Sequence, residues 1–136
     1  MAYEKTKVPI SQSQSDIRKL LASRGGTGVA FVSQPPLEGM EAMIPIDGVT
    51  YKIRIQARIP DDSRDAERDL RRIWRVLFFH LKSVFEAAAS GVLEFREMMM
   101  PYVVVKDGRT IAQHILPNLS TAIEGRPERM LPGTKD

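Results

Sequence analysis

Basic side chains recur at helical spacing between residues 64 and 82. A row of cations on one side of a helix can bind phosphate groups. At 100° per residue these side chains share one side of a helix; they are Arg64, Arg68, Arg71, Arg75 and Lys82. Phe79 projects from the same region. Cations beside an aromatic ring are typical of surfaces that hold a nucleic-acid backbone and stack on a base. The alternative is a solvated face with ion pairs inside the helix, such as Glu67 with Arg71 at i, i+4.

A second group of cations lies on one side of an expected strand, within residues 49–59. Apolar and polar side chains alternate there, and successive side chains of a strand point to opposite faces. Lys52, Arg54 and Arg58 therefore share one wet, basic face. If the helix covers the apolar face of this strand, the two basic patches lie on separate sides of the molecule. How the helix lies is left open by the sequence.

Apolar side chains outside the expected core indicate another class of function, protein binding. Phe79 lies almost opposite the core direction of the helix and Phe78 lies between the two, so something must cover that side. The C-terminal helices of the same chain, a second copy of the protein or a ligand could do so. A methionine run suits either core filling or an adaptable partner-binding surface; it comprises Met98, Met99 and Met100.

No set of residues indicates catalysis or metal binding. The chain has no cysteine, which excludes disulfides, thiolate catalysis and cysteine zinc sites. Four acids stand at one helix start, where the helix dipole already favours them; they are Asp61, Asp62, Asp65 and Asp69. Neither His80 nor His114 forms a recognisable group with a nucleophile and an acid. We therefore expect no catalytic residue, no metal and no cofactor, and a protein that is not an enzyme.

The composition is that of a globular protein with a mild basic bias. The chain has 136 residues, enough for one domain with a core, and carries 20 Lys+Arg against 17 Asp+Glu. A net charge of +3 is too small by itself to indicate a nucleic-acid partner. No secretory signal and no apolar run long enough for a membrane span is recognised. These features favour a protein of the cytoplasm with no membrane partner.

The N-terminal third is expected to contain one short helix. Ser13, with Asp16 three residues later, resembles a capping box. Apolar side chains from Ile17 to Leu21 give the stripe of a short helix, which Gly25 and Gly26 would end. Residues 1–12 are expected to form an extended arm or an edge strand.

Three strands are expected next. Small and β-branched residues predict the first at Gly28–Ser33, and two prolines place residues 34–39 in a loop. Asp47-Gly48 between two β-prone runs predicts a hairpin with a type I′ turn. Pro45 in the first arm predicts that this arm lies on a sheet edge or carries a bulge.

A long helix from about Arg64 to Ser90 follows, with Asp61, Asp62 or Ser63 as its cap. Its apolar side chains cluster on one side; they are Ala66, Leu70, Ile73, Trp74, Leu77, Leu81, Val84, Phe85 and Ala88. The natural way to bury this stripe is against the apolar face of the sheet.

The C-terminal third is expected to contain short helices. One is predicted around residues 92–100, ended by the proline that follows, and residues 102–105 form a β-prone run. Thr110 can cap a last helical segment over residues 111–123, which Pro117 should kink or split. The fold class predicted is α+β: an antiparallel sheet of about three strands packed on one long helix, with short N- and C-terminal helices. Residues 1–125 would form a single domain and residues 126–136 a flexible tail.

Two stretches resemble a family of small uncharacterised proteins encoded by bacteriophages, prophages and other mobile elements. They are "YEKTKVPISQSQSDIRKLL" and the stretch from "WRVLFFHLK" through "DGRT" to "ILPNL", so the likeness runs from Tyr3 to about Leu119. The positions that match are Trp74, Arg75, Lys82, Asp107, Gly108, Arg109 and Thr110. The hairpin and the MMMPY stretch depart from the family pattern. The resemblance implies a mobile-element context and no particular chemistry.

The leading hypothesis from the sequence is therefore a non-enzymatic accessory protein of a phage or mobile element that binds nucleic acid through the basic helix face. The alternative is a protein-interaction module or homodimer that acts through the Phe78/Phe79 or the Met98–Met100 surface.

Overall fold

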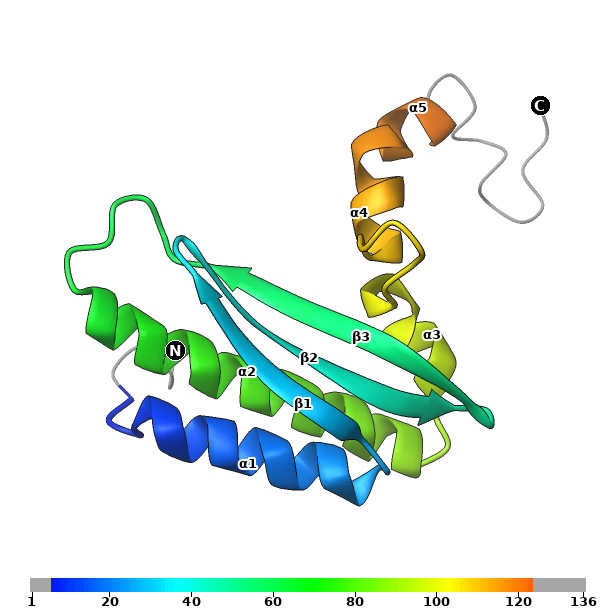
Figure 1. Cartoon of the computed structure of the whole chain (residues 1–136), viewed down its shortest axis with the longest axis horizontal. Coiled ribbons are helices and arrows are strands. Elements are labelled where there is room, and N and C mark those ends of the chain that lie inside the picture. The colour runs from blue at the N-terminus through cyan, green and yellow to red at the C-terminus, as the bar shows by residue number, and fades with distance from the viewer. Residues whose placement is uncertain (1–5, 124–136) are drawn as a thin grey trace.

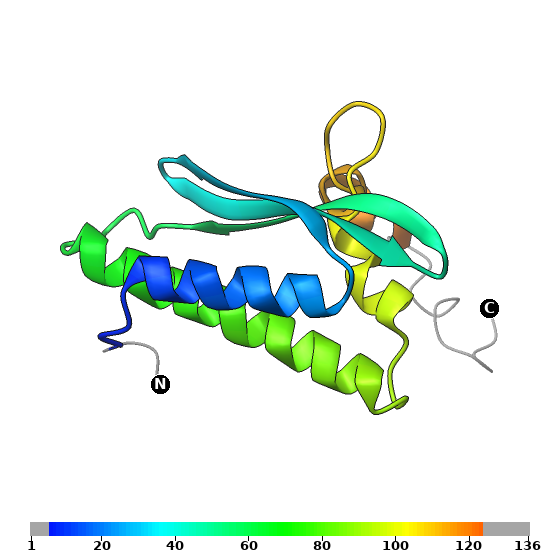
Figure 2. The same cartoon turned by 60° about the horizontal axis from the view of Figure 1, so that its bottom comes forward.

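The computed structural model describes residues 6–123 and has the α+β fold that the sequence predicts. One antiparallel sheet is covered on one face by two long helices, α1 and α2, which lie side by side (Figures 1 and 2). The elements of this body are α1 (Ile10–Ser23), β1 (Thr27–Gln34), β2 (Leu37–Ile46), β3 (Val49–Arg58) and α2 (Ala66–Ala89). Five short elements follow: α3 (Phe95–Met99), η1 (Met100–Tyr102), α4 (Ile111–Ile115), η2 (Leu116–Asn118) and α5 (Leu119–Ile123). No helix within the described residues is both long and apolar enough to cross a membrane.

The sheet has the strand order β1-β2-β3, and its second hairpin is the predicted one. Asp47 and Gly48 both have positive φ, 51° and 82°, as a type I′ turn requires. Ile46 pairs with Val49 across this two-residue turn, so the predicted alternation of β3 is kept in register. The apolar side of β3 consequently faces the helices.

Of the two alternatives predicted for the strand that contains Pro45, the edge position is wrong, because β2 is the central strand. The other, a bulge, has a counterpart in the β1–β2 pairing, where the register shifts between Thr27 and Ala30 of β1. β2 tolerates a proline because β1 pairs with β2 only as far as Met43, so Pro45 has a neighbouring strand on one side alone. The predicted loop over residues 34–39 is also too long. Leu37 already pairs with Gln34, and only Pro35 and Pro36 form the turn.

The core lies between the sheet and the two helices and centres on Trp74, whose side chain is almost fully buried. The Trp74 ring meets Phe31 of β1 edge-to-face at 5.3 Å between centroids. Its indole N–H donates to a carboxylate oxygen of the buried Glu38, 3.2 Å away, and the Ser33 hydroxyl donates to the other oxygen. Most of the predicted stripe of α2 is buried as expected, whereas Ala66 at its start is exposed.

Both helix caps predicted in the N-terminal half are wrong, although α2 begins close to the predicted Arg64. α1 begins at Ile10 rather than after Ser13, so residues 10–12 are helical and not extended. Ser13 lies inside the helix, fully buried against α2, and therefore forms no capping box. α2 is capped by Asp65, whose carboxylate accepts the Arg68 N–H at 3.1 Å. The Ser63 hydroxyl donates instead to the buried Asp69. The remaining part of the predicted arm, residues 1–5, and the predicted tail, residues 126–136, lie outside the described residues.

The C-terminal third is only partly as predicted. α3 is shorter than the expected helix 92–100, because residues 92–94 are not helical and Met100 already belongs to η1. The β-prone run contributes two isolated bridges, one of which pairs Val103 with Ile53 at the free edge of β3. Thr110 caps α4 through a full capping box with Gln113, and Pro117 splits the last helical segment, both as predicted.

Candidate interaction surfaces

Arg75, a member of the predicted basic row, lies in the contact between α1 and α2. Its guanidinium donates to the Asp16 carboxylate at 2.9 Å and approaches the Ser13 hydroxyl at 3.5 Å. The same guanidinium lies over the rings of Phe78 and Phe79, 4.5 Å and 5.0 Å from their centroids. The hydrogen bond from Arg75 lowers the pKa of Asp16 below its ordinary value of 3.8. Arg75 therefore holds the two helices together and is not available to a phosphate in this arrangement.

The rest of the row is divided between paired and exposed cations. Arg71 pairs with Glu67 at 3.2 Å, the intrahelical pair expected from the spacing, and Lys82 lies 3.9 Å from Glu86. Within residues 6–123, Arg64 and Arg68 are exposed and form no ion pair. Carboxylates of the same fold thus neutralise three of the five cations, which leaves a short basic end of α2 rather than a continuous row.

The strand cations lie on the face of the sheet opposite the helices, so the two basic patches are separate. Lys52 and Arg54 both approach Glu41 of the neighbouring strand, at 3.7 Å and 2.7 Å, and Arg58 lies 3.4 Å from Asp61. Lys52 and Arg58 remain well exposed, whereas the Arg54 side chain is about one-fifth exposed.

The turn that precedes α4 adds to the basic face of the sheet. Arg54 donates to the Gly108 carbonyl at 2.7 Å, and the Val104 N–H donates to the Lys52 carbonyl at 2.8 Å. These bonds hold the two ends of the turn against β3, and Lys106, within the turn, is exposed. A polar hollow of about 490 Å³ lies on the same face, lined in part by Arg54 and by Gln113 of α4. The sequence holds no local signal for this meeting, because the partners are about fifty residues apart.

The carboxylate of Asp107, in the same turn, lies close to the nitrogens of Arg109 and His114. It accepts the Arg109 backbone N–H at 3.0 Å and the Arg109 side chain at 3.2 Å, and its carboxylate lies 2.8 Å from Nε2 of His114. These contacts tie the turn to α4. Nε2 of His114 is buried against this carboxylate, although the pair does not meet the angular criteria of a hydrogen bond.

We expect the Asp107 carboxyl to titrate with a pKa of about 2, against an ordinary value of 3.8, mainly because it accepts the Arg109 N–H and then because of His114. A pKa depressed in the folded state means that this stabilisation is complete above pH 3.8 and is lost as the pH falls toward 2. NMR titration of the carboxyl carbon measures it. The His114→Ala variant should shift the pKa upward but not fully to 3.8; an unchanged value would mean that His114 does not act on Asp107.

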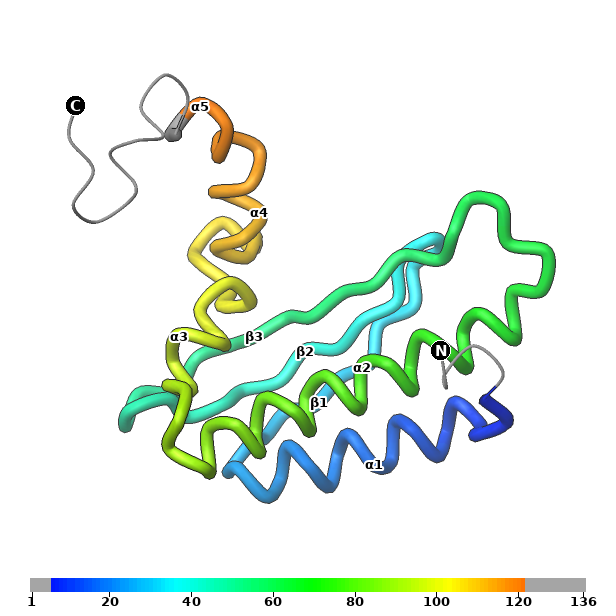
Figure 3. The backbone as a smooth tube through the Cα atoms, turned by 180° about the vertical axis from the view of Figure 1, so that it is seen from behind, coloured from blue at the N-terminus to red at the C-terminus, as the bar shows by residue number. Residues whose placement is uncertain are grey.

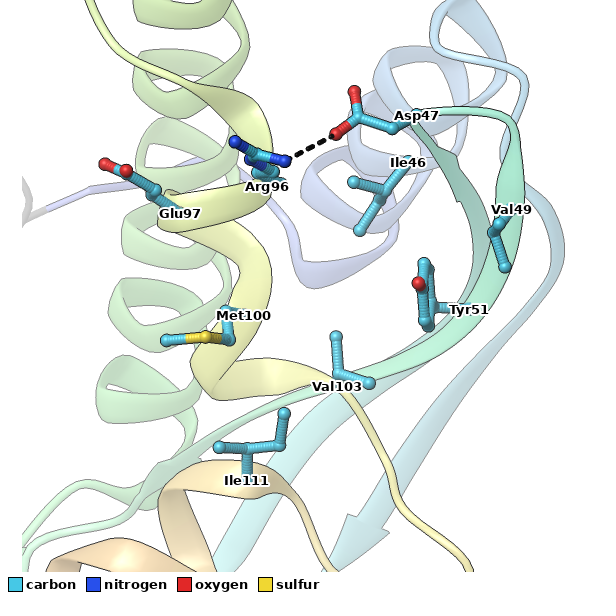
Figure 4. A pocket seen from close by; sticks show the side chains of 9 residues that line it. All are labelled: Ile46, Asp47, Val49, Tyr51, Arg96, Glu97, Met100, Val103 and Ile111. Carbon is cyan, nitrogen blue, oxygen red and sulfur yellow. Dashed lines mark ion pairs between the residues drawn. The ribbon is translucent and has the colours of Figure 1, made fainter.

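An apolar hollow of about 460 Å³ lies between the tip of the β2–β3 hairpin and the segment from α3 to α4 (Figure 4). Val49 and Tyr51 line it from the hairpin, and Met100, Val103 and Ile111 line it from the other side. At its rim Arg96 lies 3.8 Å from Asp47 (Figure 4). Val49 is 53% exposed, Tyr51 38% and Met100 52%, so the hollow is open to solvent.

Exposure of Val49 and Tyr51 was not predicted, because both belong to the apolar set of the strand that alternation assigns to the buried face. Farther along β3, Ile53 and Ile55 of the same set are buried. The tip of the hairpin reaches beyond the helices, so side chains of one face differ in burial (Figures 1 and 2). Alternation reports which face a residue lies on and not how far the covering element reaches.

The segment from α4 to α5, residues 111–123, is called the C-terminal arm here. It leads away from the hairpin tip and from the two long helices (Figures 1 and 3). Three large apolar side chains on it, one from each of α4, η2 and α5, are exposed: Ile115 by 50%, Leu116 by 63% and Leu119 by 43%. Asn118 donates to the His114 carbonyl at 3.3 Å within the arm, whereas Gln113 and His114 contact Thr110 and Asp107 just before it. Every side chain from Ile115 to Thr121 is exposed, so the apolar side chains of the arm lie in solvent.

The two predicted protein-binding surfaces are only partly exposed. Phe78 and Phe79 are half-buried, meet edge-to-face with 5.1 Å between ring centroids, and lie under Arg75, so α1 and α2 themselves cover part of this side. Of the methionines, Met99 is fully buried and Met98 packs against the core, which removes Met99 from any surface. Met100 alone of the three is exposed, and it lines the hollow.

No protein-family model matches this chain, and neither curated proteins nor solved structures include a significant match to it.

Proposed function

We propose that this protein is a protein-interaction module that binds its partner with the apolar end of the molecule. This end comprises the hollow and the C-terminal arm. The observation that carries the proposal is that most of the large apolar side chains exposed in the described residues gather there. They are Val49, Tyr51 and Met100 at the hollow and Ile115, Leu116 and Leu119 on the arm.

The composition of this end supports the proposal. Single exposed apolar side chains are ordinary, but an open apolar hollow with polar residues at its rim is typical of an interaction site. Tyrosine, methionine and arginine are enriched at protein interfaces, and Tyr51, Met100 and Arg96 stand together around the hollow. A hollow of this volume can receive side chains from a partner, which is how the anchor residues of interfaces bind.

Photo-cross-linking tests the proposal. A benzoylphenylalanine at position 51, inside the hollow, should form an adduct with another protein in cells that express the chain. The matched control is the same group at position 56, which is exposed on the opposite face of the same strand. Absence of an adduct from position 51, or equal adducts from both positions, would contradict the proposal.

A second candidate function, nucleic-acid binding, is favoured by the bond from Arg54 to Gly108, which gathers cations on the open face of the sheet. Lys52, Arg58 and Lys106 are exposed there, and the polar hollow beside them offers amide groups to bases. The resemblance to mobile-element proteins adds weight to this candidate. Arg64 and Arg68 at the start of α2 form a separate cationic site.

If this candidate is correct, affinity for single- or double-stranded DNA falls steeply with salt, because binding releases counterions from phosphates. The triple variant Lys52→Glu, Arg58→Glu and Lys106→Glu should weaken binding at least tenfold and flatten the salt dependence. Fluorescence anisotropy measures both. Arg96→Glu makes one such charge reversal at the apolar end and should bind as wild type does; no binding at low salt would exclude this candidate.

A further inference from the structure

We propose that the partner at the apolar end is a second copy of this chain, and that each copy places its C-terminal arm in the hollow of the other. This inference rests on the proposed function and names its partner. It begins from the fact that one chain carries both an apolar hollow and an exposed apolar segment able to fill it.

The arm has the properties of a donor. Ile115 ends α4, Leu116 begins η2 and Leu119 begins α5, and all three are exposed, so the arm offers apolar side chains of the kind that anchor helices in grooves. The capping box of Thr110 and Gln113 holds the start of the arm in shape before any contact is made, which lowers the entropy lost on binding. Residues 111–121 contain no lysine, arginine, aspartate or glutamate, so docking buries no full charge other than any on His114.

The hollow has the properties of an acceptor. Its walls are the apolar side chains of Val49, Tyr51, Met100 and Val103, and its charged groups, the Arg96–Asp47 pair and Glu97, stand around them (Figure 4). An apolar centre with polar groups at the rim is the usual anatomy of a protein interface. An apolar side chain can enter without separating the ion pair.

A chain does not fill its own hollow in this fold. Ile111, the first residue of the arm, is part of the wall of the hollow, and from there the arm runs away from the hairpin tip (Figures 1 and 3). Leu116 and Leu119 are therefore exposed although an apolar site exists in the same chain. A second copy removes this restriction.

The arm and the hollow adjoin each other in one chain, which favours a closed dimer. In a two-fold symmetric dimer, the arm of the first copy contacts the hollow of the second, and the arm of the second contacts the hollow of the first. The same contact is therefore formed twice. Because Ile111 belongs to the hollow and begins the arm, both contacts of such a dimer would lie at the same end of the molecule. The expected assembly is a dimer rather than an open chain of copies.

Light scattering at concentrations from about 1 µM to 1 mM, the range of moderate to weak affinities, tests the inference. Wild type should be dimeric at the upper end. Leu116→Glu puts a charge on the arm and Met100→Lys puts one in the hollow, and each alone should raise the dissociation constant at least tenfold. Val76→Glu changes an equally apolar, 40% exposed residue of α2 and should leave the dimer unchanged.

Mixing the two disabled variants separates arm-in-hollow exchange from other dimers. In the mixture one contact is the wild-type pair of Leu116 and Met100, and the other joins the new glutamate to the new lysine, so dimers should return. Contacts of arm with arm, or of hollow with hollow, would not be restored. Circular dichroism confirms that both variants remain folded.

A monomeric wild type, a dimer that both variants leave intact, or variants that mixing does not rescue would each overturn the inference. The cross-linking experiment distinguishes this failure from failure of the proposed function. An adduct from position 51 with the mass of two chains supports self-association. An adduct of another mass keeps the interaction module but assigns its partner to a different protein, and no adduct removes both.

Discussion

Replacing Trp74 by alanine is expected to lower the free energy of unfolding by about 3–5 kcal/mol, the range for loss of a large buried aromatic. The side chain is 1% exposed, packs edge-to-face on Phe31 and lies at the centre of the contact between α2 and the sheet. Urea unfolding followed by circular dichroism measures the change, since the variant loses the only tryptophan. The Val76→Ala variant of the same helix should change stability by no more than about 0.5 kcal/mol.

The phenylalanine variant isolates the polar part of the effect. Trp74→Phe keeps most of the ring but removes the N–H that Glu38 accepts. The buried carboxylate then keeps the Ser33 hydroxyl but loses a second donor, which should cost about 1–3 kcal/mol. Adding Glu38→Leu should make the further Trp74→Phe change less costly, since no carboxylate remains. Equal effects of Trp74→Phe in both backgrounds would show that the bond to Glu38 does not stabilise the fold.

Replacing Arg75 is expected to weaken the fold rather than a nucleic-acid complex. Arg75→Ala removes a charged hydrogen bond to Asp16 and the stacking on Phe78, and a loss of about 1.5–3 kcal/mol in the free energy of unfolding follows. Arg75→Glu should cost more, because it sets a second carboxylate beside Asp16. Thermal unfolding measures both variants.

Two control experiments test whether the loss of stability comes from the Arg75–Asp16 bond. Arg71→Glu reverses a charge one turn earlier on α2, where the cation pairs only with the exposed Glu67, and should change stability by at most about 1 kcal/mol. In a double-mutant cycle, Arg75→Ala should cost less when Asp16 is already asparagine. Additive effects of the two changes would contradict a direct bond between these side chains.

The acid dependence follows from the same bond. Because the pKa of Asp16 is lowered in the folded state, its contribution is complete above the ordinary value of 3.8 and is lost as the pH falls through the folded value. Between neutral and acidic pH, the free energy of unfolding should therefore fall less for Arg75→Ala than for wild type, because the variant lacks this bond.

Arg75 also shows why the candidate site was only partly predictable. The helical wheel correctly excludes it from the stripe that faces the sheet, but a wheel describes one helix and does not contain α1. Asp16 lies 59 residues away along the chain, and only the packing of α1 on α2 makes the two side chains neighbours. A cation outside the core stripe can therefore still be internal to the fold.

Local patterns were sufficient where a short segment determines its own conformation. Alternation in β3, the Asp47-Gly48 turn, the apolar stripe of α2 and the Thr110 cap each depend on neighbours within a few residues. The predicted capping box at Ser13 is wrong because burial of this residue against α2 outweighs the preference of serine for a helix cap. Pro45 was tolerated in a central strand because β1 ends before it.

The sequence by itself determined the α+β class, the hairpin, the long helix and the buried position of Trp74. These follow from side-chain periods of two and 3.6 residues, which are properties of single elements. Only the tertiary structure decided that Arg75 pairs with Asp16, that the turn around Gly108 meets the strand cations, and that Val49, Tyr51 and Met100 line one apolar hollow. Each of these depends on where one element ends relative to another, and that distance is set by packing between segments far apart in the chain.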